Sequence, residues 1–306
     1  MIVAMRAHWN WRCRSPIAAL CFALVFALSN GTRSQELAGT LKHVHDTGSI
    51  TLGYRASSIP FSYVDTHGVP IGYSIDLCNE IVDEVSNALG IEVTVKYKEV
   101  TAENRIATLL AGDIDLECGS TTANFERKKQ VAFSPVFFVS GTKLLVRRDS
   151  GIASYLDLRD KTVVVTSGTT NEAAIRAVSD KQKLGIKLLI GKDHAESFAI
   201  LSGGRADAFA TDDVLLYGLV ATSKTGGDYM VVGDYLSYDP YGLMFRKGDP
   251  DFAEIVDRTF ARLAEDREIV QLYNKWFLKR LPSGERLNLP ISPQLEEFFR
   301  VLGVPD

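Results

Sequence analysis

Hydrophobic and polar positions along the first half of the chain recur with periods that predict alternating strands and helices. Ser49–Ala56 has the composition of a strand, and Ser74–Leu89 carries apolar residues three or four positions apart, as an amphipathic helix does. Alternating apolar positions over Val93–Tyr97 predict a half-buried strand. A short helix over Asn104–Ala111 and a strand over Asp113–Cys118 complete this series.

The same order of elements begins again after residue 160. Lys161–Thr166 predicts a strand, and Thr169 with Glu172 has the spacing of a capping box at the start of a helix. Further strands are expected over Lys187–Ile190 and Ala206–Thr211, each followed by a helix. This alternation favours an α/β protein with two units, each a mostly parallel sheet flanked by helices.

The last part of the chain is too short for a third unit. Tyr241–Lys247 predicts a strand and Asp251–Leu263 an amphipathic helix, which we expect to return and complete the first unit. The chain would then cross between the units twice, near Ser140–Thr142 and near Asp239–Gly242, as in proteins that move about a hinge. From Leu281 on, prolines and glycine predict a surface loop and one short helix.

The first thirty residues have the pattern of a secretory signal. Arg6, Arg12 and Arg14 precede an apolar run of 12 positions, Ile17–Leu28, which ends in small residues. We expect cleavage just before Asn30 and therefore export of the chain. The alternative is a membrane anchor that stays in place, but the run is short for a bilayer span.

Composition and charge narrow the classes of partner. The 306 residues are 46% hydrophobic and 24% charged, which is typical of a globular protein, and the length suits two domains. With 34 Lys and Arg against 38 Asp and Glu the net charge is -4, and without residues 1–29, which hold three arginines and no acids, it becomes 31 − 38 = −7. Nucleic acid is therefore not an expected partner.

Two cysteines, Cys78 and Cys118, remain once the signal is removed. An exported protein can join them, but two cysteines are too few for a disulfide scaffold and their spacing matches no zinc motif. The simpler interpretation is two buried small apolar residues, with a bridge as the alternative.

Polar residues gather where the expected strands end, which is where open parallel sheets bind ligands. Singly, each has a structural explanation as a helix cap or a solvated arginine. Together they suit a small ligand with two carboxylates and one ammonium group, because guanidinium groups and helix N-termini bind carboxylates and aspartate binds ammonium. The residues are Arg55, Ser57 and Ser58, then Gly119–Thr122 with Arg127, Ser167–Thr170, Asp193 and His194, and Asp212 and Asp213.

Motifs for catalysis or metal binding are missing from the sequence. It contains no GxSxG, no glycine-rich phosphate loop and no HExxH. Asp113 and Asp115 are two positions apart, and we expect a solvent-facing strand edge rather than an acid–base pair. His43 and His45 are too few for a metal site. No cofactor, metal or catalytic residue is therefore expected.

Long segments of the chain carry a resemblance to a known family. They are YRASSIPFSY (54–63), IGYS (71–74), ENRIATLLAGDIDLECGSTTANFERKKQVAFS (103–134), VVVTSGTTNEAAI (163–175), KDHAESF (192–198) and GRADAFATDD (204–213). Over residues 40–300 the chain resembles the periplasmic glutamate/aspartate-binding proteins of bacterial ABC importers, within the family-3 solute-binding proteins. The resemblance implies a two-lobed type II periplasmic-binding-protein fold with residues 38–139 and 242–306 in lobe 1, residues 140–241 in lobe 2 and the ligand between them.

The resemblance also implies which residues hold the α-groups of an amino acid. Arg127 would clamp the α-carboxylate from the first lobe, a loop of the second lobe would close on it, and Asp212 would bind the ammonium group. The whole set is Ser120, Thr122, Arg127, Gly168, Thr169, Thr170 and Asp212.

For the ligand's side chain, the resemblance implies that Arg55, Arg105 and His194 bind the second carboxylate, and that Phe61 packs against the aliphatic part. Related proteins commonly have serine where this chain has Ala102. A hydrogen bond to a charged group is worth about 1.5–3 kcal/mol. The affinity and the preference between glutamate and aspartate therefore stay open.

The implied function is capture of L-glutamate or L-aspartate in the periplasm by hinge closure and delivery to an ABC-type membrane permease, with the protein acting as a monomer. Two alternatives stay open. The closed form could signal to a sensor, or the chain could be a periplasmic dehydratase on the same fold, which would need a poised proton donor or base.

Overall fold

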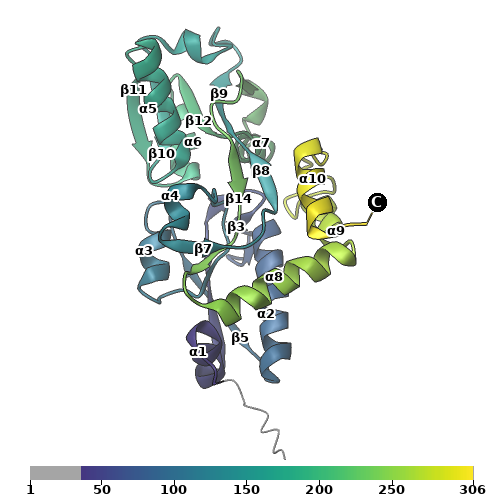
Figure 1. The fold of residues 1–306 in the computed structure, drawn as a ribbon. Coiled ribbons are helices and arrows are strands. Elements are labelled where there is room, and N and C mark those ends of the chain that lie inside the picture. Colours follow the sequence, from purple (N-terminus) through teal and green to yellow (C-terminus); the bar gives the residue numbers. More distant parts are fainter. Residues whose placement is uncertain (1–35, 306) are drawn as a thin grey trace, which may run out of the picture. The chain divides into compact units, whose positions relative to one another are not determined.

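The computed structural model describes residues 36–305, and Figure 1 shows how its helices and strands follow one another. The expected secretory signal, residues 1–29, lies outside the described residues. From Leu37 on, the described chain forms one compact unit that contains two five-stranded sheets. Within this described part, no helix is both long and apolar enough to cross a membrane.

The first sheet combines early strands with one strand from near the end of the chain. In order across the sheet these are β5 (Thr94–Glu99), β1 (Ser49–Tyr54), β6 (Leu116–Glu117), β15 (Met244–Arg246) and β7 (Val131–Phe133). Strand β1 runs parallel to β5 and β6, whereas β15 runs antiparallel to β6 and β7. The late segment therefore inserts between β6 and the edge strand β7.

The second sheet is built from one continuous stretch of the chain. Its strands, in order, are β11 (Lys187–Gly191), β10 (Thr162–Thr166), β12 (Ala208–Asp212), β9 (Thr142–Arg147) and β13 (Tyr229–Val232). Strand β10 is parallel to β11 and β12, and β9 is antiparallel to β12 and β13. Val163, Val164 and Val165 are all fully buried, as expected for a strand covered on both faces.

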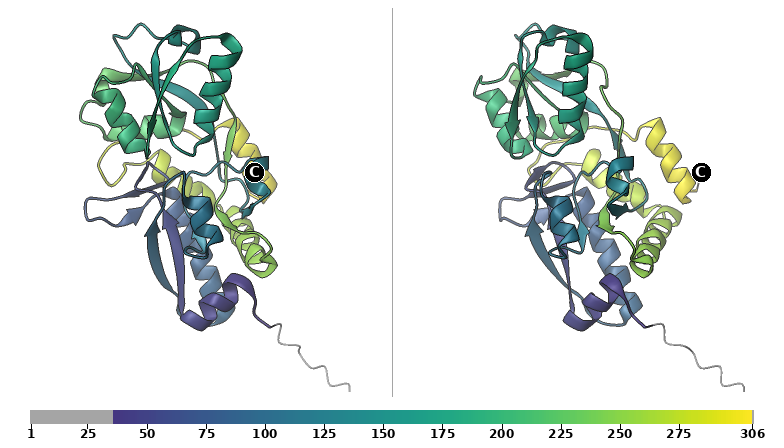
Figure 2. Two further views of the ribbon diagram at one scale, coloured as in Figure 1. Left: turned by 90° about the vertical axis from the view of Figure 1, so that its left-hand side faces the viewer. Right: turned by 60° about the vertical axis from the view of Figure 1, so that its left-hand side comes forward.

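A two-stranded ribbon connects the sheets. Strands β8 (Phe138–Ser140) and β14 (Asp239–Tyr241) pair antiparallel, with Ser140 opposite Asp239. Strand β8 leads into β9 and β14 leads into β15, so both passages between the sheets run side by side. Figure 2 shows the sheets in separate halves of the described chain on either side of this ribbon. The lobe boundaries stay a prediction.

The strand expected over Tyr241–Lys247 is divided between the ribbon and the first sheet. Gly242 lies at the break, and a Cβ there would lie 3.2 Å from Cβ of Phe133. A further small sheet is formed by β2 (Ser57–Ser58), β3 (Ser62–Val64) and β4 (Pro70–Ile71).

Helices cover both sheets, and the helix predicted over Ser74–Leu89 forms as α2. On the second sheet, Val163 and Val165 pack on the face where α5 contributes Ile175, while Val164 packs on the opposite face with α6 and α7. The helices are α1 (Gly39–Thr47), α2 (Tyr73–Leu89), α3 (Arg105–Leu110), α4 (Phe125–Lys128), α5 (Thr170–Gln182), α6 (His194–Ser202), α7 (Asp213–Thr222), α8 (Pro250–Glu265), α9 (Glu268–Phe277) and α10 (Pro293–Leu302), with short 3-10 helices η1 (Tyr155–Leu158) and η2 (Gly226–Asp228).

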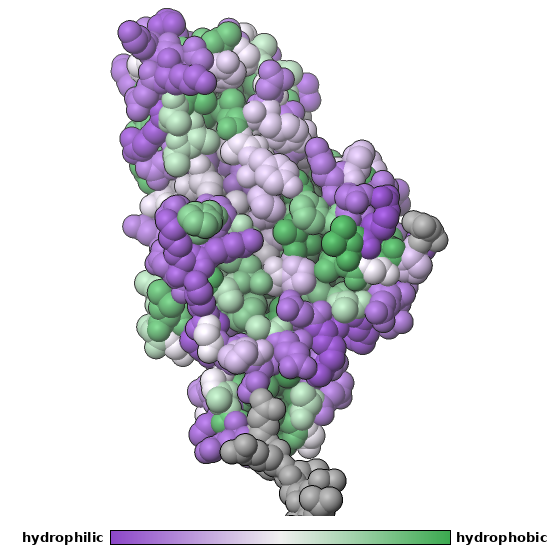
Figure 3. Space-filling model, viewed as in Figure 1, coloured by the Kyte–Doolittle hydropathy of each residue, from purple (hydrophilic) through white to green (hydrophobic). Residues whose placement is uncertain are grey.

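The C-terminal part contains one helix more than predicted, α9, before the expected short helix α10. A groove there is lined by Val270, Ile291 and Phe299 among other residues. Figure 3 shows hydrophobic side chains gathered in the region of these helices, whereas the outer end of the second-sheet half is mostly polar.

Cys78 and Cys118 form a disulfide, so the simpler interpretation of two unpaired buried cysteines is wrong. The bridge joins α2 to the residue that directly follows β6, and both residues are fully buried. Residue Gly119 and the polar segment Ser120–Thr122 come next in the chain. The disulfide therefore fixes the start of this segment to the helix behind it.

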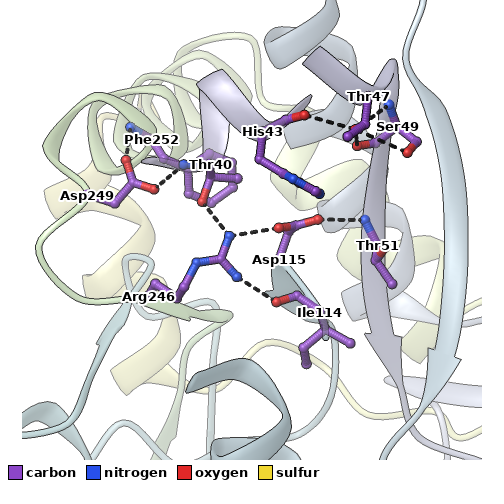
Figure 4. A network of polar contacts seen from close by, with 10 residues as sticks. All are labelled: Thr40, His43, Thr47, Ser49, Thr51, Ile114, Asp115, Arg246, Asp249 and Phe252. Carbon is purple, nitrogen blue, oxygen red and sulfur yellow. Dashed lines mark hydrogen bonds and ion pairs between the residues drawn. The ribbon is translucent and has the colours of Figure 1, made fainter. Parts of the chain in front are cut away.

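Asp115 is not at a solvent-facing edge, which corrects the expectation from its spacing with Asp113. Figure 4 shows its carboxylate held between Arg246, at 2.7 Å, and the backbone N–H of Thr51, at 2.9 Å. Arg246 also donates to the hydroxyl of Thr40 in α1. Because Arg246 comes from β15, this ion pair ties the late strand to the early part of the chain.

Candidate functional site

A small cavity lies beyond the carboxyl ends of strands from both sheets. Ser120 and Thr122 follow β6, Thr169 follows β10 and His194 follows β11. The cavity has a volume of only about 10 Å³, room for about one water molecule, so the two halves must separate before a solute can enter. Its lining residues are Arg105, Ser120, Thr122, Arg127, Thr169, Thr170, Asn171, His194, Asp212 and Leu215.

Most of the residues predicted from the sequence line this cavity. Arg55, Phe61 and Gly168 were predicted and are not among the lining residues, whereas Asn171 and Leu215 line the cavity and were not predicted.

Arg55 and Arg105 are buried guanidinium groups, each only 2% exposed. Within the described residues, Nη1 of Arg55 and Nε of Arg105 have no hydrogen-bond partner, and the same is true of Oγ of Ser120. A buried charged donor without a partner is unfavourable by more than about 1–3 kcal/mol. An anion bound in the cavity would offer acceptors to such donors.

Three arginines bring positive charge to the cavity, Arg105 and Arg127 from its lining and Arg55 from behind it. Burial, and then the charge of Arg105, lowers the pKa of Arg55 to about 10. The same two causes lower the pKa of Arg127 to about 9, so both groups stay charged at neutral pH. Burial, with Arg55 and Arg105 nearby, holds the pKa of His194 well below its usual value, so its ring is neutral. Its Nδ1 lies 3.0 Å from Oγ1 of Thr166.

Asp212 supplies a carboxylate to the cavity from the end of β12. Asn171 Nδ2 donates to its Oδ1 at 2.7 Å, and the hydroxyl of Tyr241 donates to its Oδ2. Burial, and then the charge of Asp239, raises the pKa of Asp212 to about 7. A ligand ammonium group beside this carboxylate would favour its charged form.

Arg127 and the threonine hydroxyls join the two halves of the site. Arg127 donates from Nη1 to the carbonyl of Thr122 at 2.9 Å and from Nη2 to the carbonyl of Gly168 at 3.3 Å. Oδ1 of Asp239 accepts from the hydroxyls of Thr122, at 3.0 Å, and Thr170, at 2.8 Å. The guanidinium and both hydroxyls are thus positioned together although they come from different sheets.

Gly168 lies in the loop after β10, and its backbone packs closely against the loop that contains Ala102 and Glu103. Its φ is +72°, and a Cβ there would lie only 2.6 Å from Cα of Glu103 and 2.8 Å from the carbonyl oxygen of Ala102. Beside it, Oγ of Ser167 donates to Oε2 of Glu103 at 2.9 Å. The two loops therefore meet across the cavity.

Phe61 is not among the residues that line the cavity, and its contact with the ligand stays a prediction. Its side chain is fully buried, and its ring lies 4.9 Å from that of Phe138 and 5.1 Å from that of Tyr241, centroid to centroid. An aromatic ring gains more from such edge-to-face packing in a dry core than from the wall of a polar cavity. Leu215 of α7 is the apolar lining residue instead.

The sequence around the two unpredicted lining residues, Asn171 and Leu215, has no pattern that marks them as part of a binding site. Asn171 follows Thr169 and Thr170, which predict the start of a helix, and its role depends on a partner 41 positions away. Leu215 lies in an apolar helix where the sequence does not distinguish lining from core positions.

The family follows from a match over most of the chain. The model of bacterial extracellular solute-binding proteins, family 3, matches residues 50–279. The chain belongs to this family. This family 3 solute-binding protein is 44% identical to the L-glutamate/L-aspartate-binding protein of Pseudomonas aeruginosa, with 92% of this chain and 94% of the relative covered. It is 40% identical to the glutamate/aspartate import solute-binding protein of Escherichia coli, with 94% and 96% covered.

Solved structures agree with the fold of this family 3 solute-binding protein, which is the two-lobed type II periplasmic-binding-protein fold. A mutant of the arginine-binding protein of T. maritima is similar at a TM-score of 0.70 and 32% identity, covering 78% of this chain and 99% of that one. An ancestral amino acid-binding protein, described as a precursor of cyclohexadienyl dehydratase, is similar at a TM-score of 0.66 and 31% identity, with 78% and 99% covered.

Proposed function

We propose that this family 3 solute-binding protein captures L-glutamate or L-aspartate in the cavity between its sheets. The observation that carries the proposal is the set of two buried guanidinium groups, Arg55 and Arg105, with the partly buried Arg127, beside Asp212, the carboxylate among the lining residues. An acidic amino acid matches this set, because it brings two carboxylates and one ammonium group. The names of the two relatives above support the same class of ligand.

The residues are assigned as follows. Arg127 holds the α-carboxylate, and Asp212 binds the α-ammonium group. The hydroxyls of Thr122 and Thr170, which donate to Asp239 in this structure, would turn to the α-carboxylate when the ligand binds. Arg55 and Arg105 attract the side-chain carboxylate, with the neutral ring of His194 as a hydrogen-bonding partner. Arg55 acts from beneath the lining residues, by its charge and through the donor that has no partner among residues 36–305.

Ligand capture works by closure of the two halves around the β8–β14 ribbon. Several hydrogen bonds already join the halves, among them those of Arg127 to Gly168, of Ser167 to Glu103, and of the backbone N–H of Ala195 to Oγ of Ser57 at 3.3 Å. A ligand that contacts residues of both halves adds to these contacts only in the closed form. That difference in affinity is what shifts the equilibrium towards closure.

The expected setting is the periplasm, after removal of residues 1–29, with the closed monomer delivering its ligand to an ABC-type permease of the inner membrane. The named relatives are solute-binding proteins, and we propose that this chain likewise has no enzymatic activity. Incubation with candidate substrates should give no product by mass spectrometry. Uptake of labelled glutamate that depends on the protein would separate a role in import from a role in sensing.

Calorimetric titration tests the proposal directly. Residues 30–306 are unfolded and refolded to remove carried ligand, then titrated with L-glutamate, L-aspartate, L-glutamine and L-asparagine. We expect a Kd of about 1 µM or lower for the acids, a free energy of about −8 kcal/mol or stronger, and much weaker binding of the amides. A preference for an amide would overturn the assignment of Arg55 and Arg105, and no binding of any of the four would overturn the proposed function.

A further inference from the structure

Glu117 is a buried carboxylate that does not line the cavity. It lies in β6, opposite Gly53 on one side and Met244 on the other, and it is 0% exposed. Its Oε2 accepts a hydrogen bond of 2.7 Å from the hydroxyl of Thr121. Its Oε1 is buried and has no hydrogen-bond partner within residues 36–305. A carboxylate in such a place needs nearby positive charge to stay ionised.

The neighbouring glycine shows where this carboxylate lies. A Cβ on Gly119 would lie 2.3 Å from Oε1 of Glu117 and 2.9 Å from Cγ of Arg55, so both side chains pack against Cα of Gly119. The next residue, Ser120, lines the cavity. Glu117 and Arg55 therefore lie together directly behind the cavity wall.

The charge of Glu117 acts on every arginine of the site. Burial lowers the pKa values of Arg55, Arg105 and Arg127, and in each case the carboxylate of Glu117 opposes this effect. Glu117 is thus a counter-charge that the three guanidinium groups share. Its negative charge also extends to whatever anion these groups bind.

We propose that Glu117 is a specificity-determining residue, whose carboxylate behind Gly119 repels the side-chain carboxylate of a bound acidic amino acid and so limits the preference for acids over amides. The inference rests on the proposed function, because it concerns the group that Arg55 and Arg105 attract. The α-carboxylate and α-ammonium groups are common to an acid and its amide. The ratio of their affinities therefore isolates the effect on the side chain.

The test is the variant Glu117→Gln, which keeps the side-chain volume and an acceptor for Thr121 while removing the charge. Kd values for L-glutamate, L-glutamine, L-aspartate and L-asparagine are measured by calorimetry on refolded wild type and variant. We expect the acid-to-amide affinity ratio to rise by roughly tenfold. Thr121→Val is the matched control, because it removes the hydrogen bond to Oε2 but leaves the charge, and its ratio should stay at the wild-type value.

A positioning role alone would change the affinities for acids and amides by the same factor, and that result overturns the proposal, as does a fall in the ratio. If Glu117→Gln does not fold because the arginines are left unbalanced, the comparison is made in an Arg55→Gln background. The double variant should then exceed Arg55→Gln in its acid-to-amide ratio by the same factor, and equal ratios would overturn the inference. Wild-type protein that binds no acid would instead overturn the proposed function.

Discussion

The side-chain amide of Asn171 donates a hydrogen bond of 2.7 Å to Oδ1 of Asp212, and the same nitrogen donates to the hydroxyl oxygen of Thr142 at 2.7 Å. Both ends of this contact are buried. The first residues of α5 therefore orient the carboxylate that is proposed to bind the ligand's ammonium group.

Asn171→Ala should weaken binding of acids and amides alike by about 10- to 100-fold, because a hydrogen bond to a charged group is worth about 1.5–3 kcal/mol. Calorimetric titration measures the change. Glu172→Gln is the control, since Glu172 is the next residue of the same helix and bonds only to exposed Arg176 through its side chain. Equal affinities in Asn171→Ala and wild type would show that Asp212 needs no such support.

The raised pKa of Asp212 predicts that affinity depends on pH. In the ligand-free protein the group holds a proton below pH about 7, because burial and Asp239 disfavour its charge. Ammonium binding needs the charged form, so a proton is released on binding at lower pH. Affinity should be constant above pH 8 and fall, by at most about tenfold per pH unit, below 7. Titrations in buffers of different ionisation enthalpy would measure the released proton, and an affinity that is flat from pH 5.5 to 8 would contradict the assignment.

The same group affects the stability of the ligand-free protein in the opposite direction. The folded-state pKa, about 7, lies above the ordinary value of 3.8, so the folded state binds more protons than the unfolded state between these values. The contribution of Asp212 to the free energy of unfolding should therefore decrease as the pH rises from about 4 to 7. Urea unfolding of wild type and Asp212→Asn across this range measures the difference.

Substitutions of Arg55 and Arg127 should change the selectivity between acids and amides differently. Arg127→Ala removes the α-carboxylate clamp and should abolish binding of every amino acid tested. Arg55→Ala should weaken binding of glutamate and aspartate by about 10- to 100-fold and of the amides less, because only the acids carry a second carboxylate. Arg176→Ala, an exposed arginine of α5, should leave all affinities unchanged. If Arg55→Ala lowered the affinity for acids and amides by the same factor, Arg55 would have no role in recognising the ligand's side chain.

Gly168→Ala should hinder closure. An added Cβ would collide with the backbone of Ala102 and Glu103 at 2.6–2.8 Å. In small-angle scattering, saturating glutamate should reduce the radius of gyration of wild type but not, or much less, that of the variant. Gly151→Ala is the matched control, because Gly151 has the same φ of +72° but nothing within 4 Å of the added atom. Equal compaction in the two variants would show that this contact does not limit closure.

Local patterns predicted the parts of the fold that depend on local physics. The periodicity of α2 and the apolar run of β10 correctly predicted which of their residues are buried. The buried face of a helix or strand depends on the pattern of its own residues. Only half of the capping box predicted at the start of α5 forms. Thr169 Oγ1 accepts from the N–H of Glu172 at 3.4 Å, but the carboxylate of Glu172 binds Arg176 instead of completing a capping box.

What could not be predicted depends on residues far apart in sequence. Asp115 is buried only because Arg246 arrives from β15 to pair with it, and Cys78 meets Cys118 only because α2 packs on the first sheet. The resemblance implies that Phe61 contacts the ligand, and what local patterns do not show is that its ring packs against Phe277 of α9, far along the chain. Strand ends, in contrast, predicted the cavity well, because parallel strands bring their carboxyl ends to one edge.

Because β15 lies between β6 and β7, the two sheets become complete at different points along the chain. The second sheet uses only residues 142–232 and can pair all its strands as soon as that stretch is available. The first sheet waits for residues 244–246, so β7 can join the other early strands only after β15 is available. The strands of the N-terminal half therefore cannot complete their sheet until the last fifth of the chain has emerged.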